Sequence, residues 1–393
     1  VYTLADDSKL KSKGIAEVKN LFANGIPSLK SDKLFELLAH PDQRVRQRAQ
    51  FALADQDLDS LPLFEKAIQP NQPLMRRIHG IWGIGQLGQK NPSALNSLAR
   101  LIGDKEMEIR ANLARTLGNH GKHLAPFRKA LIAMLEDSSP RVASLAAIAL
   151  SNHGHQDAVE PAIKMLEKND DNDVVVRHAG IMVLTKCAQF APEWKYYDHR
   201  STAVRRAIVI ALRRHKSHLL ETYFTDRDQS VRQEAIRAAY EMDVRKSYRA
   251  LSNQAHSIAL KVSPEVKWHP LTARRAIFAA WVLGQAKDAE VIAKIAANPK
   301  IDFRVRKDAL IALLEWNNPP VPDPVTGFAR TLPKNRIKLD TSIIKDLKGL
   351  IDGVDKNSID LIPRALILSE QDQIPLGELR LTRYLKNENF PEE

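Results

Sequence analysis

Histidine is the first residue type in this sequence that could do chemistry, because a neutral imidazole is a common metal ligand. The chain has twelve histidines, and some lie in close pairs: His120 with His123, His153 with His155, and His215 with His218. None of these pairs has a third ligand at a spacing typical of a zinc site. His120 and His153 each stand between an asparagine and a glycine, which favours a left-handed cap at the end of a helix, with Gly121 and Gly154 as cap residues. The sequence therefore predicts no metal site.

Two other features could indicate catalysis or cofactor binding. Cys187, the single cysteine, lies in the apolar run 181–188 with no evident activating partner, so we interpret it as a small buried hydrophobic residue. Gly83, Gly85 and Gly88 match Gly-x-Gly-x-x-Gly, but no predicted strand precedes them. We interpret these glycines, with Gly80, as a close helix crossing. Because Gly-x-Ser-x-Gly, a P-loop and Cys-x-x-Cys-His are also absent from the sequence, we predict no catalytic residue, no bound cofactor and no enzyme activity for this chain.

Basic residues could bind an anion. Residues 200–249 contain twelve Lys or Arg and six Asp or Glu, which is half of the net charge of +12. Four of these cations form a candidate binding surface for phosphate, an anionic polymer or an acidic partner domain: Arg206, Arg213, Arg214 and Lys216. The alternative, which we favour, is a solvated helix face, since a basic patch alone carries no specificity. A longer interval before Arg274 contains a loop that ends at Trp268 and His269, a second candidate surface.

A repeating element must position these groups. A capping residue followed four residues later by arginine recurs about every thirty residues, a period typical of helical arrays. The clear copies are Asp42 with Arg46, Glu106 with Arg110, Asp173 with Arg177, Ser201 with Arg205, Asp228 with Arg232, and Asp302 with Arg306. Weaker copies have Arg77, Ala143 and Arg274 at the arginine position. The arginines are expected to be structural, and the Asp or Ser to cap a helix.

Each copy begins a run with helical apolar spacing. Val45, Ala49, Ala52 and Leu53 form a narrow stripe along one helix face, and Val231, Ala235, Ala238 and Ala239 repeat it. Shorter amphipathic helices are expected between these runs, at 33–39, 93–102, 126–135 and 158–167. This unit resembles a HEAT repeat, in which Asp plus Arg is characteristic. We therefore predict an all-α fold, a right-handed α-solenoid of about nine to eleven helical hairpins.

The pattern also suggests domain boundaries. Residues 1–30 do not fit the period and form an N-terminal extension, with a short strand expected at Val1 to Leu4. The array spans 31–316. Five prolines then fall in a segment, 317–340, that must be extended. Helical spacing returns in 341–393, which we interpret as degenerate repeats. No apolar run is long enough for a membrane span.

Three stretches carry a closer resemblance: Asp32 to Gln50, Arg77 to Gly88, and Asp323 to Pro333. In this order they resemble the middle region of PVC-type membrane-bound dehydrogenases, also called haem-binding, sorbosone-dehydrogenase-like proteins. In that family a β-propeller precedes a HEAT array and a cytochrome c module follows it. The resemblance implies a fragment of a larger exported or periplasmic protein, with Val1 to Leu4 as the last propeller strand. Because the haem motif is absent, no haem-binding or catalytic residue carries over.

The leading functional hypothesis is a non-catalytic scaffold that presents a concave, locally basic surface to another protein or to a flanking domain of the same polypeptide. The alternative is a nucleic-acid-binding protein similar to HEAT-like DNA glycosylases, which would use the arginines on phosphates and Trp194, Trp268 or Trp281 near a lesion. We favour the scaffold, because no tryptophan and carboxylate are convincingly arranged for base excision.

Overall fold

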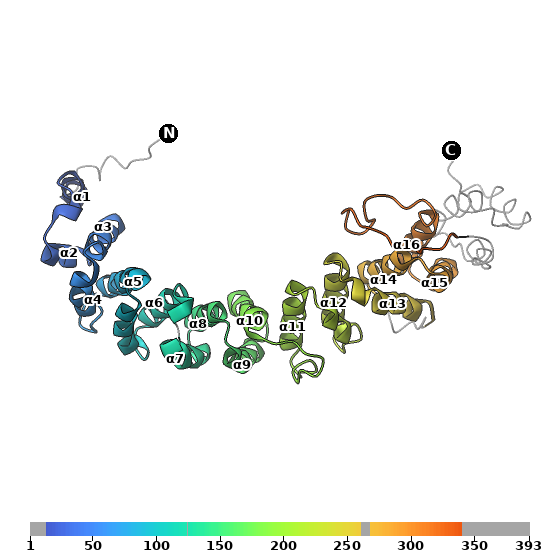
Figure 1. Cartoon of the computed structure of the whole chain (residues 1–393), viewed down its shortest axis with the longest axis horizontal. Coiled ribbons are helices and arrows are strands. Elements are labelled where there is room, and N and C mark those ends of the chain that lie inside the picture. Colours follow the sequence, from blue (N-terminus) through green and yellow to red (C-terminus); the bar gives the residue numbers. More distant parts are fainter. Residues whose placement is uncertain (1–12, 124, 261–267, 340–393) are drawn as a thin grey trace, which may run out of the picture. The chain divides into compact units, whose positions relative to one another are not determined.

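Helices form the regular secondary structure of this protein. The computed structural model describes residues 13–123, 125–260 and 268–339. Apart from the helices, the one regular element in these ranges is an isolated β-bridge between Pro322 and Ala329. The prediction of an all-α solenoid is confirmed (Figure 1). The chain separates into two compact units, residues 1–189 (unit 1) and 190–393 (unit 2). The predicted strand at Val1 to Leu4 and the predicted repeats at 341–393 lie outside the described residues.

Long helices pack side by side in unit 1, in sequence order, and we call them the helix row of unit 1. They are α3 (Gln43–Ala54), α5 (Leu74–Lys90), α6 (Met107–Gly118), α8 (Pro140–His153) and α10 (Val174–Cys187). Shorter elements pack against them: α2 (Ser31–Leu37), α4 (Leu61–Ala67), the 3-10 helix η3 (Pro92–Leu101), α7 (Arg128–Ala133) and α9 (Val159–Asn169). Helix α1 (Lys13–Ala23) precedes them and has no buried residue.

Unit 2 has a helix row of its own, formed by α11 (Thr202–Arg214), α12 (Gln229–Glu241), α14 (Pro270–Leu283) and α16 (Phe303–Leu314). The elements that pack against this row are η8 (His218–Tyr223), α13 (Tyr248–Leu260) and α15 (Ala286–Ala297). No helix precedes α11 in unit 2; instead Phe190, Trp194 and Tyr197 pack edge to face, with ring centroids 5.1 and 5.5 Å apart. Short 3-10 helices complete the described chain: η1 (Ile26–Ser28), η2 (Asp57–Ser60), η4 (Gly121–His123), η5 (Ala125–Phe127), η6 (Met134–Glu136), η7 (Gln156–Ala158) and η9 (Arg245–Ser247).

Side-chain caps fix where most of the long helices begin. The cap residue accepts a hydrogen bond from a free backbone N–H of the first turn, which typically contributes about 1 kcal/mol. Six residues do so: Asp42, Ser139, Asp173, Ser201, Asp228 and Asp302. Glu106 stands at the same position of α6 but makes no such bond. Aspartate and serine at this spacing thus set the helix starts, as the sequence pattern suggests.

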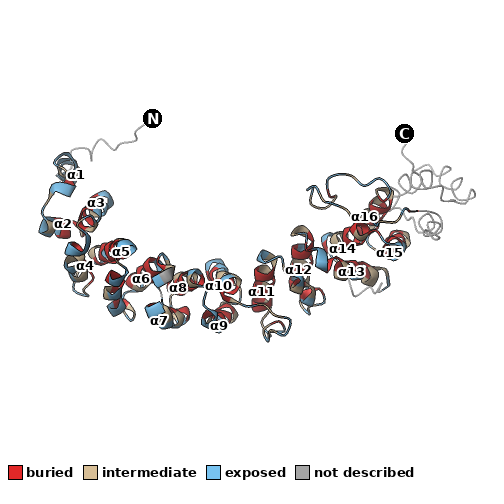
Figure 2. Cartoon of the chain, in the orientation of Figure 1, coloured by how far each residue is buried: buried red, intermediate tan, exposed pale blue. Residues whose placement is uncertain are grey.

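The apolar stripes form the core between neighbouring helices. Val45, Ala49 and Leu53 of α3 are completely buried, as are Val231 and Ala235 of α12. Burying a valine or leucine side chain contributes roughly 1.5–3 kcal/mol, and the small alanines let helices approach closely. Figure 2 shows buried residues on the helix faces that meet and exposed residues on the outward faces.

The repeated arginine links one repeat to the next. Arg110 donates from Nε and Nη2 to Asp137 at 2.7 and 3.0 Å, and Arg205 bonds Asp226 in the same way at the same two distances. Arg77 makes an equivalent bidentate contact with Asp104. Each aspartate stands two residues before the cap residue of the next long helix. It also accepts a hydrogen bond from the backbone N–H of that cap residue, at 3.0 Å from Glu106, 2.8 Å from Ser139 and 2.7 Å from Asp228. One carboxylate therefore joins the preceding arginine to the following helix start.

The same arginine also bonds its own turn. Arg46, Arg110, Arg205 and Arg232 each donate from Nη1 to the carbonyl six residues earlier. Other copies differ in the partner they use. Arg46 donates from Nε to Nε2 of His79 at 3.2 Å, Arg177 lies 3.6 Å from Asp171 in its own repeat, and Arg306 donates to the carbonyl of Ala296 at 3.0 Å.

Two expectations about local structure are wrong. Gly121 does not have the left-handed conformation and instead begins η4, close to the backbone of Asn152, whereas Gly154 (φ 74°) does cap α8. The short helices expected at 93–102 and 126–135 are present, the first as the 3-10 helix η3 and the second as α7 with a 3-10 turn on each side. Arg274 lies five residues after the cap position His269, so Ala273 occupies the arginine position of that repeat.

Replacing Arg205 by alanine is expected to destabilise the protein. Arg205 and Asp226 are 1% and 6% exposed at the side chain, and removal of one partner from a buried ion pair typically costs about 3–5 kcal/mol, because the other charge stays buried. The exposed Arg214→Ala on the same helix should change the free energy of unfolding by less than about 0.5 kcal/mol. Urea unfolding followed by circular dichroism measures both, and equal losses in the two variants would contradict the structural role of Arg205.

Candidate functional site

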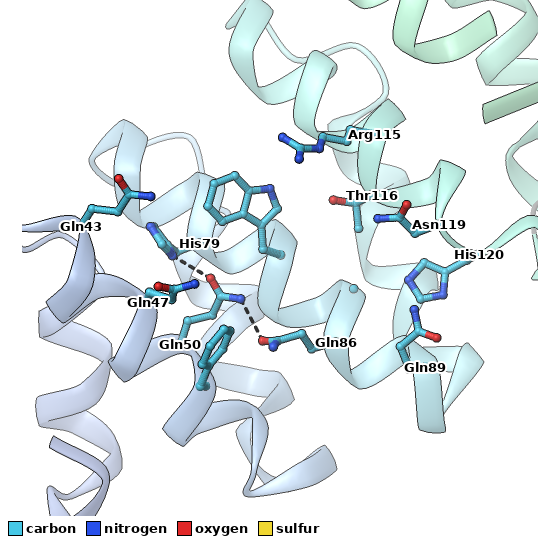
Figure 3. Close-up of a pocket in the computed structure, with 13 residues that line it drawn as sticks. Gln43, Gln47, Gln50, His79, Gln86, Gln89, Arg115, Thr116, Asn119 and His120 are labelled. Atoms are coloured by element: carbon cyan, nitrogen blue, oxygen red, sulfur yellow. Dashed lines mark hydrogen bonds between the residues drawn. The ribbon is translucent and has the colours of Figure 1, made fainter. Parts of the chain in front are cut away.

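A polar groove lies on the helix row of unit 1, across α3, α5 and α6. It encloses about 480 Å³. Its lining is rich in amides: Gln43, Gln47, Gln50, Phe51, His79, Trp82, Gly85, Gln86, Gln89, Arg115, Thr116, Asn119 and His120. Figure 3 shows Gln43, Gln47, Gln50, Gln86 and His79 on one side of the hollow, with Arg115 of α6 and Asn119 and His120, which directly follow α6, opposite them and Gln89 beside His120. We call this feature the glutamine groove.

A chain of hydrogen bonds fixes the floor of the glutamine groove. Arg46 donates to Nε2 of His79, and Nδ1 of His79 lies 2.7 Å from Oε1 of Gln50. Since Nε2 accepts, Nδ1 must carry the proton and donate to Gln50. The Gln50 amide then donates to Oε1 of Gln86 at 2.8 Å (Figure 3). Each member thus has one defined orientation, and the chain ends on Gln86 with that amide's N–H groups as donors.

Burial keeps the His79 imidazole neutral. The side chain is almost completely buried, and desolvation together with the nearby Arg46 cation lowers the pKa of His79 from 6.5 to about 4. Burial also lowers the pKa of His120 on the opposite wall. Both rings are therefore uncharged near neutral pH, as the bond from Arg46 to Nε2 requires.

Aromatic side chains flank the amides. Trp82 donates from its indole N–H to Oδ1 of Asn112 at 3.1 Å, and Asn112 in turn donates to the carbonyl of Glu108. The His79 ring meets Trp82 edge to face, with centroids 4.9 Å apart. Phe51 is 38% exposed at the edge of the groove. These contacts hold Trp82 in place and leave apolar surface beside the glutamines.

Arg115 is the one charged side chain in the lining of the groove, since no Asp, Glu or Lys lines it. The guanidinium is exposed and has no ion pair among the residues that the structure describes. With His79 and His120 neutral, the groove carries one positive charge. An acceptor group or an anion suits this lining better than a cation does.

The glycines of α5 allow the helices to pack closely here. A Cβ at Gly85 would lie 2.6 Å from Cγ2 of Thr116 on α6, and one at Gly80 would lie 2.9 Å from Cγ2 of Ile68. A Cβ at Gly83 would overlap the ring of Phe64 on α4. The interpretation of these glycines as a close helix crossing is therefore confirmed.

The basic residues predicted as a surface lie on α11 and just after it. Arg213 is half-buried and donates to Glu234 of α12 at 3.2 Å, so it is part of the packing and was wrongly assigned to a free surface. Arg206 is half-buried, whereas Arg214 and Lys216 are exposed. The helix spacing that suggested one basic stripe could not show the acidic partner on the next repeat.

The second predicted surface lies on a different element. Trp268 is half-buried, and the exposed His269 is the cap residue of α14, whose side chain makes no capping bond. Of the tryptophans considered for nucleic-acid binding, Trp281 is 2% exposed and Trp194 packs among aromatic rings. Neither is available to stack on a base.

The other predicted chemistry concerns Cys187 and the histidines. Cys187 is buried, and desolvation raises its pKa to about 11, which agrees with a packing role. In the part of the chain that the structure describes, no three His, Cys, Asp or Glu side chains form a group that could hold a metal ion. Within the same residues, no helix is both long and apolar enough to cross a membrane.

A non-helical segment of the chain itself, which turns back on itself between Pro322 and Ala329, lies on the helix row of unit 2. We call residues 317–339, which contain no helix, the strap. Asp323 is buried and accepts a hydrogen bond from Oη of Tyr240 at 2.6 Å. The Arg330 guanidinium lies 4.3 and 5.6 Å from the ring centroids of Tyr240 and Tyr248, which stack on each other.

A second arginine anchors the end of the strap. Arg336 lies 4.9 and 5.0 Å from the ring centroids of Trp281 and Trp316, and it donates to the carbonyls of Val282 and Trp316 at 3.3 and 3.1 Å. Burial lowers the pKa of Arg336 to about 10. Main-chain bonds add to this contact, with Ile337 N–H donating to Gly284 at 2.9 Å.

The strap and the glutamine groove use the same face of their helices. Gly85 of α5, Tyr240 of α12 and Trp281 of α14 each lie twelve residues after their cap residue, at 73, 228 and 269. Gln86 and Val282 lie one residue further on. Positions that share a register on an α-helix share a face. The face that holds the strap in unit 2 thus forms an open groove in unit 1.

Sequence reasoning missed the glutamine groove, although a periodic signal was present. Phe51, Trp82 and Arg115 each lie nine residues after their cap residue, at 42, 73 and 106. Aligning the repeats on their caps would therefore have placed these three side chains on one surface. What the register could not show is the hydrogen-bond chain that joins His79, Gln50 and Gln86.

Comparison with known proteins found no matching family model and no matching curated protein. Similar solved structures include a mutant of the karyopherin Kap121p (13% identity, 89% of this chain and 44% of that chain, TM-score 0.49). Another is YibA of E. coli (17% identity, 79% and 98%, TM-score 0.37). A third is the CpcE and CpcF complex of phycocyanin lyase from Nostoc (20% identity, 65% and 87%, TM-score 0.30). The assignment of an all-α solenoid rests on the helices of this chain.

The buried neutral His79 makes stability depend on pH. The unfolded chain takes up a proton near pH 6.5 and folded His79 only near pH 4, so stability should be lost as the pH falls through this window, by roughly 3 kcal/mol in all. In His79→Gln this loss should be absent, and the free energy of unfolding should depend less on pH. Urea titrations at several pH values measure the difference between the two proteins. NMR titration of the His79 ring in the folded protein is the direct check, and a pKa near 6.5 would contradict the prediction.

Proposed function

We propose that this chain is a non-catalytic helical-repeat scaffold that holds an extended polypeptide segment of a partner protein against its helix row. The observation that carries the proposal is the strap, because in unit 2 this face already binds a non-helical, proline-containing segment of the chain. The binding uses side-chain contacts to Tyr240 and Trp281 and main-chain bonds such as that from Ile337 to Gly284. The same register in unit 1 forms the glutamine groove, which offers amides and an aromatic ring.

The chemistry of the groove favours binding over catalysis. Its hydrogen-bonding groups are mainly amides, which neither donate nor take up protons near neutral pH. Of its two histidines, His79 already uses both ring nitrogens in the bonds to Arg46 and Gln50. The nucleic-acid alternative has less support, because Arg205 and Arg213 are engaged with Asp226 and Glu234.

Photo-crosslinking in the native host would test the scaffold proposal. A photoreactive residue in place of the exposed Gln47 of the glutamine groove should give a discrete cross-linked product with one polypeptide. The same residue in place of Lys129, exposed on the short helix α7 outside the groove, should not give that product. Products that are identical at the two positions, or absent at both, would contradict docking on the helix row.

We further propose that the scaffold serves a larger exported dehydrogenase. The support is the resemblance described above, together with the place of its three stretches. Asp32 to Gln50 and Arg77 to Gly88 contribute to the α3 and α5 walls of the groove, and Asp323 to Pro333 forms the middle of the strap. The three stretches that carry the resemblance thus lie in the glutamine groove and in the strap.

The mass of the native polypeptide tests this second proposal. An antibody against this chain should detect, in the native source, a product much larger than 44.2 kDa that retains covalent haem on a denaturing gel. A native product of the same mass as this chain, without haem, would refute the dehydrogenase context and leave the scaffold proposal standing.

A further inference from the structure

We infer that the glutamine groove takes an extended peptide segment with a carboxylate, and that this carboxylate binds Arg115 while the peptide backbone bonds the glutamine amides. This inference rests on the proposed scaffold function and specifies the partner's chemistry at one site. The carboxylate belongs to an acidic side chain or to a free C-terminus, which share the same planar acceptor geometry.

The amides match a peptide backbone. A glutamine side chain offers both a carbonyl acceptor and N–H donors, which are the two groups of a peptide unit. Gln43, Gln47 and Gln89 are exposed and make no side-chain hydrogen bond to other described residues, so their amides can bond a ligand. Gln86 differs, because its carbonyl already accepts one bond from Gln50, whereas both of its N–H donors remain.

The spacing of these amides favours an extended ligand. Gln43 and Gln47 are four residues apart on α3, and Gln86 and Gln89 are three apart on α5, so each pair lies on one helix face. Two neighbouring helices thus present amides on both sides of the hollow's floor. A single extended strand of peptide lying between α3 and α5 would bond amides of both helices.

Charge decides what the ligand carries. Arg115 projects from α6 into a groove without an acidic side chain, and both histidines of the lining have lowered pKa values and are neutral near pH 7. A carboxylate on Arg115 gains a charge-assisted hydrogen bond, which is stronger than a bond between neutral groups. An apolar neighbour on the peptide would contact Phe51 and Trp82.

The strap is a poor occupant of this groove, although it shows how the face binds. Its anchors are Arg330 and Arg336, which contact aromatic pairs in unit 2. On α5 in unit 1, Gly85 stands at the helix position that Tyr240 and Trp281 occupy on α12 and α14, so no ring is present there. The groove lining also contains the Arg115 cation. An arginine-anchored segment would therefore meet Arg115 and lack the second ring, which commits the site to a segment of opposite charge from another protein.

Selection from a random linear peptide library against the whole chain tests the inference. Two library formats, one with free C-termini and one with blocked C-termini, separate the two sources of carboxylate. If the carboxylate is an acidic side chain, the wild-type chain should enrich peptides with Asp or Glu next to an apolar residue in the blocked format. If it is a free C-terminus, peptides without acidic side chains should be enriched, and only in the free format. Replacing the selected carboxylate by its amide should weaken binding about tenfold or more.

Matched charge reversals provide the control. Arg115→Glu should lose the acidic peptides and favour basic ones, whereas Lys129→Glu on α7, which makes the same change in net charge outside the groove, should select as the wild type does. If peptides are enriched without any carboxylate preference, and Trp82→Ala abolishes their binding, the carboxylate inference is wrong and the scaffold proposal stands. If Arg115→Glu leaves the selection of acidic peptides unchanged, the site is wrong. If no peptide is enriched, both proposals are wrong.

Discussion

The bond between a long-helix arginine and the aspartate before the next long helix sets the geometry on which the rest of this structure depends. In Arg110 with Asp137, and in Arg205 with Asp226, two N–H groups hold one carboxylate that also accepts the next cap residue's N–H. Buried ion pairs add little net stability, because desolvation offsets their attraction. Their effect is to fix register: a helix that slid along its neighbour would leave both charges buried and unpaired.

A fixed register turns a row of helices into a binding face. When the first residues of neighbouring helices are aligned, residues at the same sequence distance from each cap lie side by side. Phe51, Trp82 and Arg115 therefore line one groove although they come from three repeats. Small residues complete the effect, since Gly85 lets α6 approach until a Cβ would overlap Thr116. Function on such a face depends less on any single helix than on how the helices are aligned.

The sequence predicted features that depend on local spacing and missed those that depend on packing between repeats. Caps such as Asp228 and stripes such as Val231 with Ala235 could be predicted, because both follow from a helix alone. Arg213 was misassigned because its partner Glu234 lies on the next long helix. Gly121 was also misassigned: it begins a 3-10 turn that packs close to the backbone of Asn152, a contact that its local sequence does not show.

The groove was missed because its polar groups look unremarkable one at a time; glutamines on an exposed helix are common. The orientation of two of these glutamines depends on His79, which is neutral because it is buried. Neutral His79 accepts a hydrogen bond from Arg46 and donates one to Gln50, and Gln50 in turn donates to Gln86. A charged imidazole would donate on both sides and could not accept from an arginine. Burial of one ring thus orders two amides, and it turns the carbonyl of the last one toward Gln50 and leaves both of its N–H donors for a ligand, which suits a ligand rich in acceptors.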